Sequence, residues 1–145
     1  MTDSNLEVPE KDSCAFCDYL SGRRPFTVLW SGPLIATLVT REQRGLPHLL
    51  VVTKRHCPTI LDVTSEESKA LMDGVVAAAR AIDLNFSRPG IAVWQNNGVP
   101  AHQDIPHLHF HVAGTLPGGG TNWGEVREVS VQETDEIADI LRRGV

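Results

Sequence analysis

The stretch His107-Leu108-His109-Phe110-His111-Val112 decides how this chain folds, because polar and apolar residues alternate strictly along it. Such alternation is typical of a β-strand, in which successive side chains point to opposite faces. All three histidines are therefore expected on one face, roughly 7 Å apart, while the apolar residues anchor the strand in a core. Histidine serves as a base, a nucleophile or a metal ligand. The strand is thus a candidate functional site, and the plainer alternative is a half-buried strand whose polar face happens to be histidine.

Other strands and helices are expected on both sides of this strand. A long helix is expected over 65–84, where Thr64 and Glu67 form a capping box and apolar residues repeat at helical spacing. Apolar or β-branched runs predict strands at 27–30, 34–39, 48–54 and 91–95, and helical turns are expected after Cys17 and over 134–143. This order predicts an α+β fold, with a mostly antiparallel sheet of about five strands, one long helix and a short C-terminal helix.

Length and charge limit the class of protein. A chain of 145 residues with 41% hydrophobic content is expected to form one domain, here 13–145, after a disordered acidic tail over 1–12. The tail lacks the apolar run of a signal peptide, and no stretch is long enough to span a membrane. The net charge of −5 and the scattered basic residues exclude a nucleic-acid backbone binder. We therefore expect a cytoplasmic protein with a small-molecule partner, and neither nucleic acid nor a membrane.

The cysteines favour metal or redox chemistry over a disulfide framework. There are three, an odd number, and two of them form the segment Cys14-Ala15-Phe16-Cys17. In a reducing compartment this spacing suits a metal site, although ordinary thiols or a redox pair remain alternatives. Cys57 is interpreted as a buried thiol that takes no part in either.

The order of residues between Asn96 and Val112 resembles the histidine triad superfamily of nucleotide hydrolases and transferases. An asparagine-glycine stretch is followed by Gln103, four residues before the first of the alternating histidines. The segment from His48 to His56 resembles the family's strand in which an apolar run and a basic pair separate two histidines. The Cys-x-x-Cys segment resembles the opening of the family's zinc-containing branch. Altogether the resemblance covers about 14–123.

The resemblance implies a reaction at the α-phosphorus of a purine nucleotide derivative, either a nucleoside phosphoramidate or a dinucleoside polyphosphate. His109 would be the nucleophile and would form a covalent nucleotidyl-histidine intermediate that water resolves. His111 and Gln103 would donate hydrogen bonds to phosphoryl oxygens, where charge spreads in the transition state. His48 would support the site from the neighbouring strand. Asn96 would contact ribose or phosphate, and its alternative role is a turn before the next glycine.

An imidazole nucleophile also needs its other ring nitrogen to hold the proton. In the family a backbone carbonyl serves for this purpose, and we expect it near Gly98 or Val99. The resemblance further implies a homodimer in which the long helix and a strand edge join two sheets. An unpaired edge strand is otherwise a liability.

The zinc-containing branch implies a structural zinc ion held by four ligands. Structural zinc takes thiolate and imidazole ligands in a closed tetrahedron. The implied ligands are Cys14, Cys17, His56 and His107. His107 would then be a metal ligand and would take no part in catalysis.

Two residues depart from the family's pattern. Asp104 stands after the glutamine where relatives carry a serine or threonine. Its carboxylate would repel a phosphate unless it turns outward, is protonated, or accepts from an amine or a bound metal. We interpret it as a substrate-binding residue that favours cationic or amine leaving groups. Thr40 stands eight residues before His48, where nucleotide-binding members often have an aspartate that holds the ribose hydroxyls. The neighbouring Arg41 and Arg44 are interpreted as solvated loop charges. The sequence therefore supports nucleoside specificity only weakly.

Three classes of function remain open on this sequence. The first is a nucleotidyl hydrolase or transferase that uses His109. The second is a metal-dependent hydrolase with a metal on the histidine strand. The third is a nucleotide-binding module without turnover. Of the tryptophans, Trp94 is expected in the core, and Trp123 either closes over the site, crosses a dimer interface or packs in the core.

Overall fold

The computed structural model describes residues 4–143, and residues 1–3 and 144–145 lie outside the described part. Within this described part, three helices and five strands follow one another. The strands are β1 (Thr27–Ser31), β2 (Ile35–Val39), β3 (His48–Thr53), β4 (Ile91–Trp94) and β5 (His109–Gly114). The helices are α1 (Ala15–Ser21), α2 (Ser65–Phe86) and α3 (Val131–Leu141), with 3-10 turns at Ile60–Asp62 and Val99–Ala101.

The five strands form one antiparallel sheet in the order β1-β2-β3-β5-β4. The predicted α+β class and the predicted antiparallel sheet are therefore confirmed. The hairpin of β1 and β2 forms one side of the sheet, while β4 forms the opposite edge. The β3–β5 pair lies in the middle, so the histidine strand is held by neighbours on both sides.

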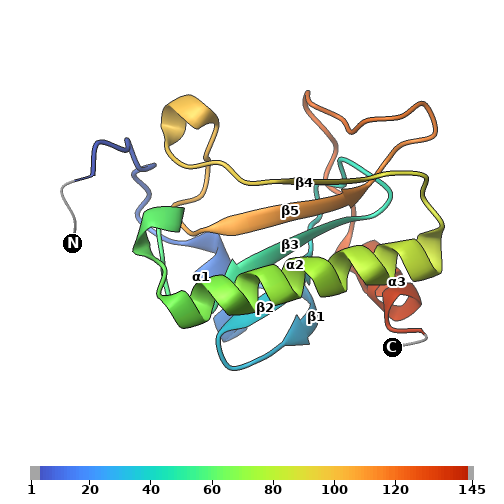
Figure 1. Cartoon of the computed structure of the whole chain (residues 1–145), viewed down its shortest axis with the longest axis horizontal. Helices are drawn as coiled ribbons and strands as arrows, with labels where there is room; N and C mark the ends of the chain where they lie inside the picture. Colours follow the sequence, from blue (N-terminus) through green and yellow to red (C-terminus); the bar gives the residue numbers. More distant parts are fainter. Residues whose placement is uncertain (1–3, 144–145) are drawn as a thin grey trace.

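Helix α2 runs across one face of the sheet, and α3 packs beside it against β1 (Figure 1). The capping box of Thr64 and Glu67 starts α2 as the sequence predicts, and the helix ends two residues later than expected. Alternate residues such as Leu49, Val51 and Val112 face these helices in the main core. Among residues 4–143, no helix combines the length and the apolarity needed to cross a membrane.

Helix α1 covers part of the opposite face. Phe16 packs there with Leu38, Leu50 and Val52 in a second, smaller core. Gly22 ends α1 in the left-handed conformation, with φ of 82°, which suits glycine. The residues before α1 form neither helix nor strand from residue 4 onward, and the Glu7 carbonyl accepts a hydrogen bond from the Val99 N–H at 2.7 Å.

The histidine strand begins two residues later than its alternation predicts. β5 starts at His109, because the N–H groups of His107 and Leu108 bond to carbonyls outside the sheet, those of Ile105 and Cys57. His109 and His111 lie on the face that α1 partly covers, since Leu50, the partner of His111 in β3, belongs to the smaller core. His107 is fully buried just before the strand.

Candidate active site

His109 is held in one tautomer by the chain segment that precedes it. Its Nδ1 lies 2.8 Å from the carbonyl oxygen of His107, which can only accept, so Nδ1 carries the ring proton. The unprotonated Nε2 is then free to act as a nucleophile in the pocket that His109 lines. The carbonyl belongs to His107, whereas the sequence placed it near Gly98 or Val99. The alternation of side chains gives no information on which carbonyl a ring nitrogen will meet.

A chain of hydrogen bonds connects the loop before β3 to His111. The Arg44 backbone N–H donates to Nδ1 of His48 at 3.1 Å, so Nε2 of His48 carries the proton. This Nε2 lies 2.9 Å from Nδ1 of His111 and donates to it. Nε2 of His111 therefore carries a proton, and His111 lines the pocket. The arrangement gives the pocket a neutral imidazole donor next to the nucleophile.

The carbonyl oxygen of Glu42 also lies close to Nδ1 of His48, at a distance of 3.0 Å. Nδ1 cannot donate to this carbonyl and accept from Arg44 at once. A carbonyl without a partner costs less than a buried N–H without one, so the accepting state of Nδ1 is favoured. Gly45 allows the loop to lie this close to β5, because a Cβ there would collide with the carbonyl of Gly114.

Burial keeps the pocket histidines neutral. Removal from water lowers the pKa of His48 to about 4 and that of His111 to about 2, because a buried imidazolium loses hydration. Burial also lowers the pKa of His109, against the opposing effects of the His107 carbonyl and the Asp104 carboxylate. At neutral pH the site therefore offers one imidazole lone pair and one imidazole N–H.

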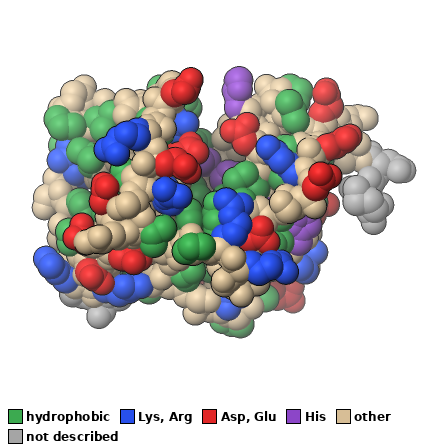
Figure 2. Space-filling model, turned by 180° about the vertical axis from the view of Figure 1, so that it is seen from behind, with side chains coloured by type: hydrophobic (Ala, Val, Ile, Leu, Met, Phe, Trp, Pro, Cys, Tyr) green, Lys and Arg blue, Asp and Glu red, His purple; other side chains and the backbone are tan. Residues whose placement is uncertain are grey.

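The pocket is a cavity of about 680 Å³ on the face opposite α2, a size that suits a nucleotide. Figure 2 shows this face, with a cleft in which histidine is visible between rims that carry acidic and basic side chains. One wall is aromatic, with Phe16, Tyr19 and Phe26, and the rings of the last two stack at 3.8 Å. An apolar wall of this kind can hold a nucleobase.

The predicted substrate-binding residues do not all reach this pocket. Asn96 and Asp104 line it, as do His48 and the two triad histidines. Gln103 is buried, with its amide N–H groups bonded to the carbonyls of Pro58 and Ile105 and its oxygen bonded to the Gly98 N–H. The amide nitrogen and the amide oxygen of Gln103 are thus both hydrogen-bonded within the chain, so Gln103 stabilises the loop beside the pocket. Sequence spacing alone could not separate these two roles.

The pocket also includes residues that were predicted to lie elsewhere or whose place was left open. Trp94, expected in the core, lines the pocket and stacks on the ring of His111. Trp123 is 78% exposed and lies beside Trp94, which excludes core packing for it. Arg41 donates to the Val129 carbonyl at 2.7 Å and thereby ties the C-terminal segment to the pocket rim. The alternation of side chains in β4 shows which residues share a face of the sheet with Trp94. Only the pairing of β4 with β5 decides whether that face is the one towards α2 or the one towards the pocket.

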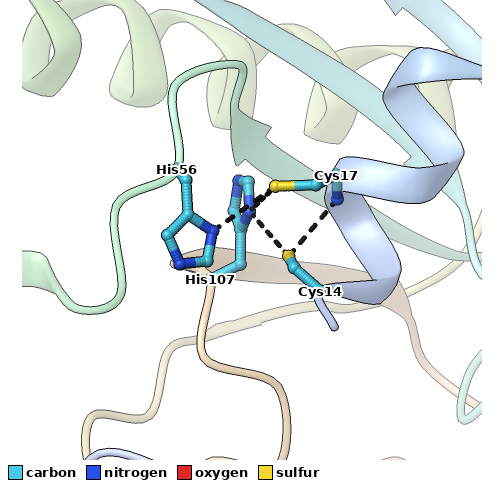
Figure 3. Close-up of side chains that lie close together, drawn as sticks. All are labelled: Cys14, Cys17, His56 and His107. Carbon is cyan, nitrogen blue, oxygen red and sulfur yellow. Dashed lines mark hydrogen bonds between the residues drawn. The ribbon is translucent and has the colours of Figure 1, made fainter. Parts of the chain in front are cut away.

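A second cluster, made of cysteine and histidine side chains, lies beside the beginning of β5. Cys14 and Cys17 from the start of α1 meet His56 from the loop after β3 and His107 from the loop before β5 (Figure 3). All four ligand atoms lie within 4.8 Å of one another. The structure therefore brings together the four residues that the sequence named as metal ligands.

The dimensions of this cluster suit a tetrahedral ion. Nδ1 of His107 lies 3.2 Å from Sγ of Cys14, and Nδ1 of His56 lies 3.4 Å from Sγ of Cys17. Bonds of about 2.3 Å to sulfur and 2.0 Å to nitrogen place tetrahedral ligands about 3.5 Å apart. Nε2 of His107 also lies 2.7 Å from the Thr53 carbonyl, which fixes its proton there and leaves Nδ1 for a metal.

The class of protein is defined by an antiparallel α+β fold and by a nucleotide-sized pocket lined by three neutral histidines, His48, His109 and His111. The family model described as the HIT domain matches residues 23–117, and the chain belongs to this family. The adenosine 5′-monophosphoramidase of Schizosaccharomyces pombe is 30% identical over 101 residues, which cover 69% of this chain and 72% of that protein.

Solved structures agree with the fold. A Hit-like protein of Bartonella henselae, described as involved in cell-cycle regulation, has a TM-score of 0.85 at 20% identity and covers 94% of this chain and 99% of that chain. A zinc-bound histidine triad family protein of Mycobacterium smegmatis has a TM-score of 0.76 at 23% identity, covering 89% of this chain and 93% of that chain. At these identities the likeness concerns the fold.

Proposed function

We propose that this protein is a nucleotidyl hydrolase or transferase that cleaves a bond at the α-phosphorus of a purine nucleotide derivative. The observation that carries the proposal is the Nδ1 contact of His109 with the His107 carbonyl, because it leaves Nε2 as an in-pocket nucleophile. The bond cleaved is the phosphorus–nitrogen bond of a phosphoramidate or the anhydride bond of a dinucleoside polyphosphate. The S. pombe relative, named as a phosphoramidase, supports the first of these substrate classes.

The proposed reaction has two displacements. The lone pair of His109 Nε2 attacks the α-phosphorus, a P–N bond to the histidine forms, and the leaving group departs with the bonding electrons and takes up a proton. Water then attacks the same phosphorus, the P–N bond breaks, and His109 recovers its lone pair while the water loses a proton. A second phosphate in place of water would make the same step a transfer.

The other pocket residues have supporting roles in this proposal. His111 donates its Nε2–H to a phosphoryl oxygen, where negative charge increases in the transition state. His48 keeps His111 in that tautomer through the 2.9 Å contact between the rings. Asn96 contacts ribose or phosphate from the loop after β4. Gln103 holds the loop and contributes no hydrogen bond to phosphate.

We further propose that the cysteine–histidine cluster holds a structural zinc ion. Two thiolates and two imidazoles form a ligand set that zinc prefers, and all four positions are protein ligands, as in structural sites. When bound, the ion would fix α1 to the loop that carries His107. No reaction step passes through it.

Geometry weighs against the alternative of a catalytic metal on the histidine strand. His107 faces the cysteines, and only His109 and His111 of the triad line the pocket. The remaining alternative, a binding module without turnover, is decided by the experiment below. We also propose a cytoplasmic homodimer. Unpaired cysteines such as these are typical of a reducing compartment. Exposed apolar residues lie on α2, at Met72 and Val76, and on the edge strand β4, at Val93.

Trapping the covalent intermediate tests the proposed function. The protein is mixed with an adenosine phosphoramidate, quenched within one turnover, and digested for peptide mass spectrometry under neutral or basic conditions that preserve phosphohistidine bonds. We expect one nucleotidyl group on His109 and a burst of the released amine. Binding of AMP without any modified peptide or burst would instead identify the chain as a binding module.

Asp104 is proposed to select the leaving group, because its carboxylate lines the pocket and is close enough to act on His109. Replacing it by asparagine or serine is expected to lower kcat/KM for a phosphoramidate with a cationic leaving amine, relative to a phosphoanhydride, by about two- to fivefold, as for an exposed ion pair. The measurement is the ratio of the two kcat/KM values in each variant. An unchanged ratio would remove Asp104 from leaving-group selection.

A further inference from the structure

Trp94 is placed against His111 by the register of the sheet. It is the last residue of β4 and lies directly opposite His111 in the antiparallel pairing with β5. The indole and the imidazole are nearly parallel, with ring centroids 4.6 Å apart and planes 6° from each other. The same indole lies 5.3 Å from the ring of His48. A single side chain therefore borders both members of the hydrogen-bonded histidine pair.

The hydrogen bond between the histidines does not by itself fix the plane of the His111 ring. A contact at Nδ1 still allows the imidazole to tilt about the bond, and a tilt would move Nε2 away from its target. The edge-to-face contact with His109, with centroids 4.9 Å apart, restrains the ring on one side. The parallel indole restrains its flat face. Together the three contacts restrain the edge and the face of the His111 ring.

We propose that Trp94 is a positioning residue that acts through His111, by holding the imidazole plane so that Nε2–H points at the phosphoryl oxygens. The inference rests on the proposed function and extends it to a residue outside the histidine triad. It requires no contact between Trp94 and the substrate. It predicts that an aromatic ring at position 94 matters more for the rate than for substrate affinity.

The test compares Trp94→Phe, which keeps a flat ring, with Trp94→Leu, which keeps an apolar side chain without one. Leucine is expected to lower kcat for an adenosine phosphoramidate by at least about tenfold, because a small misplacement of a catalytic group is costly. KM should change little, and phenylalanine should restore most of kcat. Trp30→Phe, a partly buried tryptophan of the main core, is the matched control and should keep kcat.

NMR of the histidine rings gives a readout that does not depend on turnover. The ring protons of His111 should lie upfield in the wild type because of the indole ring current, should move downfield in Trp94→Leu and should move less in Trp94→Phe. The exposed His102 is the internal reference. If leucine prevents folding, methionine replaces it, since its flexible side chain fills irregular gaps.

Each outcome bears on the proposal. A rise in KM with kcat unchanged would overturn the proposal and favour direct contact between Trp94 and the substrate. Unmoved His111 resonances would also overturn it and would mean that Trp94 only packs in the pocket wall. If phenylalanine is as poor as leucine, the flat ring is not what matters, and the proposal is again wrong. Failure of the proposed function is distinguishable, because the wild type itself would then form no nucleotidyl-His109, whatever residue 94 is.

Discussion

Replacing His109 by alanine is expected to reduce kcat for an adenosine phosphoramidate by at least about a thousandfold, as for other nucleophiles of covalent catalysis. The reason is that Nε2 of His109 keeps a lone pair in the pocket, whereas Nε2 of His111 carries a proton. The measurement is AMP release under saturating substrate. Substrate affinity, measured by binding of AMP, should be retained, because the pocket walls are intact.

Chemical rescue provides the control for this variant. His109→Gly leaves a space at the nucleophile's position, and added free imidazole should restore part of the AMP release, with an imidazole–AMP adduct as a detectable product. His111→Gly under the same conditions should yield no such adduct, since His111 is a donor in the proposal. Equal turnover by His109→Ala and the wild type would refute covalent catalysis at this residue. Loss of turnover in every protein, the wild type included, would favour the binding module.

Replacing Cys14 by alanine is expected to abolish zinc retention and to lower the melting temperature. The side chain lies 3.2 Å from Nδ1 of His107 and is one of four converging ligands. Zinc present a thousandfold above its Kd stabilises the folded state by about 4 kcal/mol. For a domain of this size such a loss lowers Tm by roughly 10 °C. Zinc content after dialysis and calorimetry of the same samples measure both effects.

Cys57→Ala is the matched control for this experiment. Cys57 is buried outside the cluster, and its thiol faces the Glu67 carboxylate at 3.7 Å. This variant should keep its zinc, even if the lost packing lowers Tm. Activity should fall together with zinc in Cys14→Ala, because His107, a proposed metal ligand, also supplies the carbonyl that holds His109. Unchanged zinc content in Cys14→Ala would mean that the cluster is not the metal site.

Chelation distinguishes the structural ion from a catalytic one. In EDTA, a structural zinc should leave slowly, and activity should decline in step with unfolding. A catalytic metal on the strand would instead be lost together with activity while the fold persisted. This contrast separates the covalent mechanism from the metal-dependent hydrolase that the sequence left open.

Local patterns explain why much of the fold was predictable. The Thr64 and Glu67 capping box begins α2, and period-2 alternation places Phe110 and Val112 toward the core and His109 and His111 toward the pocket. These features depend on neighbours a few residues apart, so the sequence contains them directly. The buried state of Cys57 also follows from residue type. The order of motifs was enough to identify the family, and the family model confirms it.

The sequence by itself thus determined the sheet, the long helix, the family and the residues that could carry chemistry. Only the tertiary structure decided what those residues do together. The stack of Trp94 on His111, the carbonyl that holds His109 and the internal bonds of Gln103 depend on strand register and loop path. Such contacts join segments that are distant along the chain or turn away from regular structure, and their geometry is fixed only when the whole domain packs. A hydrogen bond or a ring stack changes over tenths of an ångström, and residue type and spacing do not define positions at that scale.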